Sequence, residues 1–131
     1  MMKNSQKNLT LMKLIIDDPI PWRRVKPNYQ QRRMYEDTEQ RKFKEYIGIL
    51  AIEAMNGKPP VKYPLFAELK IYRNFSPISI HFGDIDNFQK VIFDALNQIA
   101  YVDDRQIVKV VAEKIKSTVP RALLTLTKAG A

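Results

Sequence analysis

The sequence predicts a single α+β domain over residues 1–131, in which a mixed β-sheet of about four strands packs against two main helices. Three observations indicate this fold class. Apolar residues recur with period two in some segments and with helical spacing in others. A chain of 131 residues suits one core, and 45% of the residues are hydrophobic, which is typical of globular proteins. The polar residues 1–8 are expected to form a flexible N-terminus.

The first half of the chain contains a strand, an irregular segment and a helix. Residues 9–16 are rich in apolar and β-branched side chains and predict a strand. Three prolines then predict an irregular segment over residues 17–35. A helix is expected to begin at Asp37, with Gln40 completing a capping box, and to end before Gly57 and the two prolines after it.

The second half alternates strands with one further helix. Leu65, Ala67, Leu69 and Ile71 fall on one face of a strand predicted over 61–73. An amphipathic stripe predicts a helix that runs from about Asn87 to Ile99. The remaining predicted elements are a strand over 107–115, for which periodicity also allows a helix, and a short strand over 122–127.

Composition limits the classes of partner and site. Lysine and arginine number 22 against 14 acidic residues, so the formal net charge is +8. This charge suits a polyanion such as nucleic acid, although many small basic proteins owe their charge to solubility alone. The chain has no cysteine, which excludes disulfides, thiolate metal sites and cysteine nucleophiles. No segment has the pattern of a secretory signal or a membrane span, so we expect a soluble intracellular protein.

A cluster of acidic residues carries the strongest functional signal. Asp84 and Asp86 stand at the entrance of the second predicted helix, Lys90 lies one turn inside it, and Asp103 and Asp104 follow its end. Carboxylates this close repel one another, so a cation is needed to hold them together. Oxygen-rich sites of this kind suit magnesium, calcium or manganese. In a basic protein, such a cluster suggests hydrolysis of a phosphodiester backbone.

Each of these residues also has a structural explanation. Asp86 fits the N-cap position with Gln89 completing a capping box, which on its own is the commoner role for such an aspartate. Lys90 could be a solvated helix charge, and Asp103 and Asp104 the polar start of a turn. The two acidic groups are separated by a helix of roughly 20 Å, so the second group must fold back to join the first.

The residues from Asp84 to Asp104 resemble the central signature of the RusA family of Holliday-junction resolvases. The family pattern is Asp-x-Asp-Asn-x-x-Lys, then Phe-Asp-Ala-Leu, then an Asp-Asp pair before a strand. Here it reads Asp84-Ile85-Asp86-Asn87-Phe88-Gln89-Lys90, Phe93-Asp94-Ala95-Leu96 and Asp103-Asp104, with a link one residue shorter. The order of predicted elements is also similar to the RusA-like fold.

The resemblance implies a homodimeric, magnesium-dependent endodeoxyribonuclease that resolves four-way DNA junctions by paired nicks during recombination and repair. Manganese could substitute for magnesium, one or two ions could act, and no organic cofactor is expected. Asp84, Asp86 and Asp104 match the catalytic, metal-binding carboxylates, Lys90 matches the essential lysine, and Asp103 is a further candidate ligand. The resemblance also implies a cytoplasmic protein of bacterial or phage origin.

The segment from Trp22 to Tyr35 mixes basic and aromatic residues. Arginines can bind phosphates while aromatic rings stack on unpaired bases at a crossover. Alternatively, Trp22 and Tyr35 anchor the segment to the core, and its charges are merely solvated. The candidate DNA-binding residues are Arg23, Arg24, Lys26, Arg32 and Arg33.

Two other functions remain open at the level of sequence. The chain could be a non-catalytic module that binds branched DNA, with a purely structural acidic cluster. It could also be a nuclease that acts on flaps or replication forks, which the sequence does not separate from a junction resolvase.

Overall fold

The computed structural model describes residues 9–22, 26–28, 33–35, 38–74 and 84–130. In chain order the elements are β1 (Thr10–Asp17), β2 (Lys26–Asn28), β3 (Arg33–Tyr35), α2 (Thr38–Met55), β4 (Leu65–Arg73), α3 (Ile85–Leu96), the 3₁₀ turn η2 (Asp104–Gln106), β5 (Ile107–Lys116) and β6 (Arg121–Lys128). Some predictions concern residues outside the described ones: the flexible N-terminus 1–8, the helix start at Asp37, and the candidate DNA-binding residues Arg23, Arg24 and Arg32.

Four strands form the main sheet, in the order β1-β6-β4-β5. β6 pairs antiparallel with both β1 and β4, whereas β4 and β5 are parallel. The sheet is therefore mixed, as predicted, and residues 107–115 belong to a strand. Because β4 and β5 run in the same direction, the chain must return along the sheet between them, and α3 makes that crossover.

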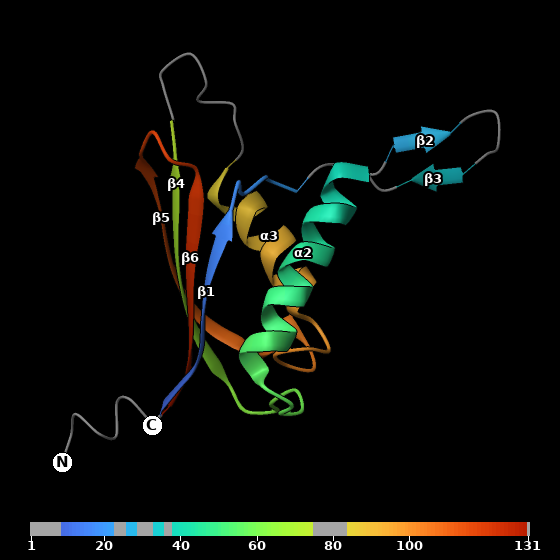
Figure 1. The fold of residues 1–131 in the computed structure, drawn as a ribbon. Coiled ribbons are helices and arrows are strands. Elements are labelled where there is room, and N and C mark those ends of the chain that lie inside the picture. The colour runs from blue at the N-terminus through green and yellow to red at the C-terminus, as the bar shows by residue number, and fades with distance from the viewer. Residues whose placement is uncertain (1–8, 23–25, 29–32, 36–37, 75–83, 131) are drawn as a thin grey trace.

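Both helices cover the same face of the sheet and enclose the core with it (Figure 1). Leu65, Ala67, Leu69 and Ile71 of β4 are fully buried, which confirms the predicted period-two pattern. α2 and α3 pack their apolar stripes against this face and against each other. No helix among the described residues combines the length and apolarity that crossing a membrane requires.

α3 ends three residues before the predicted boundary at Ile99. Asn97 leaves the helical conformation with φ −57° and ψ 133°, and Gln98 adopts a positive φ of 68°. Ile99 nevertheless packs against the core. The apolar periodicity therefore continues beyond the helix, because it records packing rather than backbone conformation.

A small hairpin replaces part of the segment that was predicted to be irregular. β2 and β3 pair antiparallel, with Pro27 opposite Met34. A two-stranded ribbon tolerates a proline because each strand is an edge and not every N–H is needed for pairing. Strands of three residues are too short to produce a periodic pattern, which explains the difference. The hairpin extends away from the body, beyond α2 (Figure 1).

Candidate active site

The first part of the site is the exposed start of α3. Asp84 is the N-cap residue, and its backbone carbonyl accepts hydrogen bonds from the N–H groups of Asn87 (3.0 Å) and Phe88 (3.2 Å). Its side chain makes no capping hydrogen bond. The prediction that Asp86 is the N-cap was wrong, because the helical backbone begins at Ile85 and Asp86 lies in the first turn. Both aspartate side chains are exposed, near the positive end of the helix dipole.

Lys90 lies one turn further along the same face as Asp86. It is exposed, and its Nζ atom lies 3.7 Å from the ring centroid of Trp22. The backbone N–H of Trp22 donates to the carbonyl of Asn87 (2.9 Å), and its partly buried ring packs against the core. Trp22 therefore anchors the segment that leads to the hairpin, which agrees with the structural reading of that residue.

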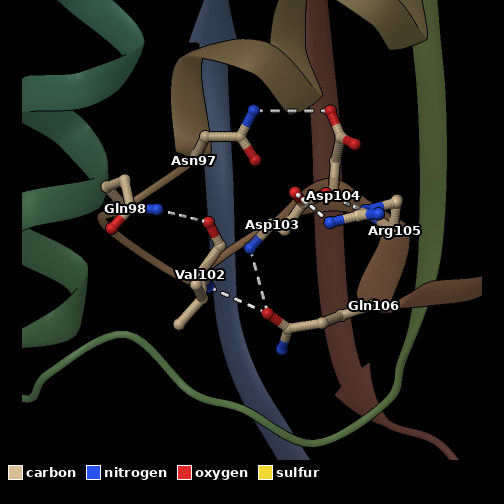
Figure 2. A network of polar contacts seen from close by, with 7 residues as sticks. All are labelled: Asn97, Gln98, Val102, Asp103, Asp104, Arg105 and Gln106. Atoms are coloured by element: carbon tan, nitrogen blue, oxygen red, sulfur yellow. Dashed lines mark hydrogen bonds and ion pairs between the residues drawn. The ribbon is translucent and has the colours of Figure 1, made fainter.

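The second part of the site lies at the other end of α3. Asn97 Nδ2 donates to Asp104 Oδ2 across 3.4 Å, a long hydrogen bond (Figure 2). Asp103 is the N-cap of η2: Oδ1 accepts from the backbone N–H of Arg105 (2.9 Å), and Oδ2 lies 3.2 Å from its guanidinium. The hydrogen bond from that N–H and then the Arg105 side chain hold the pKa of Asp103 below its usual range. Asp103 therefore has a capping role, while Asp104 points towards α3.

Gln106 fixes the backbone around the acidic pair. Its Oε1 atom accepts from the N–H groups of Val102 (2.9 Å) and Asp103 (3.0 Å), as Figure 2 shows. Its Nε2 atom donates to the carbonyls of Val61 (2.9 Å) and Tyr63 (3.0 Å). The side chain thus joins the turn at Asp103 to the segment before β4. Sequence analysis missed this residue, although the Asp103-x-x-Gln106 spacing of a capping box was a signal.

Tyr101 connects the same turn to α3 from within the core. It is fully buried, and its hydroxyl donates to the carbonyl of Phe93 (2.6 Å). Burial, followed by the negative charges of Asp104, Asp94 and Asp103, raises the pKa of Tyr101 far above its ordinary value. The phenol therefore keeps its proton, and its hydrogen bond to the Phe93 carbonyl, up to a higher pH than an exposed tyrosine would.

The site residues divide between the two ends of α3. Asp84, Asp86 and Lys90 lie at its beginning, whereas Asp104 contacts Asn97 at its end, about 17 Å further along the helix axis from Asp86. Within the part of the chain that the structure describes, no group of three or more acidic or histidine side chains could hold a metal ion. Of the predicted DNA-binding residues, the structure places Lys26 in β2 and Arg33 in β3.

A comparison with protein-family models shows the family to which the chain belongs. The sequence defines the class of protein, because the model of the family described as endodeoxyribonuclease RusA matches residues 18–127. That match begins directly after β1 and covers both helices, β4, β5, nearly all of β6 and every candidate catalytic residue. The chain belongs to the RusA family. No curated protein matches it significantly.

Proposed function

We propose that this protein is a magnesium-dependent endonuclease that resolves Holliday junctions by paired nicks during DNA recombination and repair. It would act in the cytoplasm of a bacterial cell, as a host or phage protein. The observation that carries the proposal is the exposed pair Asp84 and Asp86 with Lys90 one turn on, in a chain of the RusA family.

The donor chemistry of the site fits a hard divalent cation. Asp84 and Asp86 offer exposed carboxylates at the start of α3, and magnesium prefers carboxylate oxygens and water. Asp104 is the third proposed ligand, and Asp103 a secondary one because Arg105 already engages its oxygens. When bound, the ion would polarise the phosphate and activate a water molecule.

The protein's own side chains would complete the chemistry. The Lys90 ammonium has three donors and lies on the face of α3 that also carries Asp86. It would contact the scissile phosphate and offset the charge that develops on its oxygens. The segment from Trp22 to Tyr35 would bind the arms of the junction through phosphate contacts from Arg23, Arg24, Lys26, Arg32 and Arg33. The net charge of +8 favours such contacts.

We further propose that the active form is a homodimer whose copies share each metal site. Cutting two strands symmetrically requires two sites, which a two-fold dimer supplies. The length of α3 separates Asp104 from Asp84 and Asp86 of the same chain. The apolar face of α3 is buried in the core, so the helix cannot unwind to bring these carboxylates together, which supports a site shared between two copies. In such a dimer, Asp104 of the second copy lies beside Asp84 and Asp86 of the first copy and supplies the third carboxylate.

Mixed dimers test this arrangement. A heterodimer of Asp84→Asn and Asp104→Asn chains, purified with two different tags, is expected to recover nicking of one strand. In a shared site, one of its two sites has all its wild-type carboxylates and the other has lost both. Each variant alone is the control. If the heterodimer is as inactive as the two parents, each site takes its carboxylates from a single chain.

The main experiment compares a labelled four-way junction with a linear duplex of the same sequence. With magnesium, we expect paired nicks on the junction and none on the duplex, and EDTA should prevent cutting. Tight junction binding without cutting in magnesium or manganese would instead support a non-catalytic binding module. Faster cutting of flaps or forks than of the junction would change the substrate but keep the nuclease.

A further inference from the structure

The contact between Lys90 and Trp22 joins two distant segments of the chain. Trp22 is the chain's one tryptophan and lies just before the hairpin, whereas Lys90 belongs to α3. The ammonium stands 3.7 Å from the indole centroid, well within the range of a cation–π interaction. Indole is the aromatic ring with the strongest attraction for a cation.

The backbone fixes the ring independently of the lysine. The N–H of Trp22 donates to the carbonyl of Asn87, in the first turn of α3, and the ring packs against the core. The indole face is therefore a fixed surface, whereas Lys90 is an exposed side chain with a flexible four-carbon stem. Without a partner, such a side chain samples many rotamers, and ordering it has an entropic cost.

We propose that Trp22 is a positioning residue for Lys90, holding its ammonium on the face of α3 where the phosphate is expected. This inference rests on the proposed function for the role of Lys90, but the contact itself does not. An ammonium over a ring face still directs N–H donors away from the ring, so Lys90 can bind a phosphate oxygen while it stays in place. Trp22 also links the hairpin to the site, since β2 follows it in the chain.

Other lysines of the described residues provide matched controls. Lys128 lies over Tyr63 with 4.9 Å to the centroid, and Lys109 lies over Phe66 with 5.1 Å. Both belong to strands of the main sheet and lie outside the proposed site. Replacing either lysine removes the same charge and a similar contact.

The first experiment uses the fluorescence of the single tryptophan. Lys90→Met is expected to change the intensity or emission maximum of Trp22, whereas Lys128→Met and Lys109→Met are expected to leave both unchanged. Saturating junction DNA in EDTA is expected to change the emission of the wild type, and this response should be lost in Lys90→Met. An emission that is identical in wild type and Lys90→Met would overturn the contact, whatever the activity of the protein.

The second experiment tests positioning through cleavage. Trp22→Leu is expected to lower the single-turnover rate constant of cleavage about tenfold, with junction affinity unchanged. Trp22→Phe should restore part of this rate because it keeps an aromatic face. The double variant Trp22→Leu/Lys90→Met should cut no more slowly than Lys90→Met, because residues acting through one group are not additive. Thermal unfolding confirms that each variant is folded.

Two outcomes separate this inference from the proposed function. A folded Trp22→Leu that cuts at the wild-type rate, or a double variant much slower than Lys90→Met, would overturn the positioning role while the nuclease assignment stands. A wild type that cuts no DNA would overturn the proposed function and the catalytic part of the inference. The fluorescence response to DNA would then still decide whether Trp22 and Lys90 act together in binding.

Discussion

Replacing Asp84, Asp86 or Asp104 with asparagine is expected to reduce junction cleavage more than about a thousandfold, because a catalytic metal contributes several kcal/mol to the transition state. Asparagine keeps the size of the side chain but removes the charge that attracts the ion. The free energy of unfolding should change by less than about 0.5 kcal/mol for Asp84 and Asp86, since both side chains are exposed. Single-turnover cleavage and urea denaturation measure the two effects.

A charge-matched control and a binding assay complete this experiment. Glu113→Gln removes one negative charge from an exposed position on β5 and should cut normally. The aspartate variants should bind the junction as tightly as the wild type or more tightly, since each removes a negative charge facing DNA. Normal cutting by Asp84→Asn or Asp86→Asn would show that the site lies elsewhere.

Gln106→Ala is expected to lower the free energy of unfolding by about 2–4 kcal/mol, one of the larger effects of a partly buried polar residue. The side chain makes four hydrogen bonds, two as acceptor and two as donor. Its loss leaves the carbonyls of Val61 and Tyr63 and the N–H groups of Val102 and Asp103 without these partners. Urea denaturation measures the change, and cleavage should also fall because the turn orients Asp104.

Gln98→Ala is the matched control for this variant. Gln98 is also a glutamine beside the turn, but it is exposed and its Nε2 atom donates one hydrogen bond, to the carbonyl of Val102 (2.7 Å). Its removal should cost less than about 1 kcal/mol. If both variants unfold at the same urea concentration as the wild type, Gln106 does not hold the turn.

The fold was largely predictable because its elements have strong patterns. The alternation in β4 and the apolar stripe of α3 identified a strand and a helix. The apolar face of each element is buried in the core, as expected. The boundaries of α3 were less predictable. Asp84 and Asp86 are both good N-cap residues, and only the backbone conformation distinguishes them.

The candidate site was predictable only in part. The spacing of Asp84, Asp86, Lys90 and the acidic pair identified the motif, and the family match bears out the resemblance. The contact of Trp22 with Lys90 and the contacts of Gln106 with Val61 and Tyr63 depend on the tertiary fold. Local sequence patterns carry no information about such pairs.

The left-handed residue Gln98 has a consequence for how chain length varies in relatives. The turn that follows α3 has no helical register to keep, so gaining or losing one residue there alters a connection and leaves the crossover intact. The same change inside α3 would rotate everything beyond it by about 100° and turn Lys90 or Asp86 away from solvent. We therefore expect natural insertions and deletions to gather around the exposed Gln98, before the buried Tyr101, and α3 to vary by substitution alone.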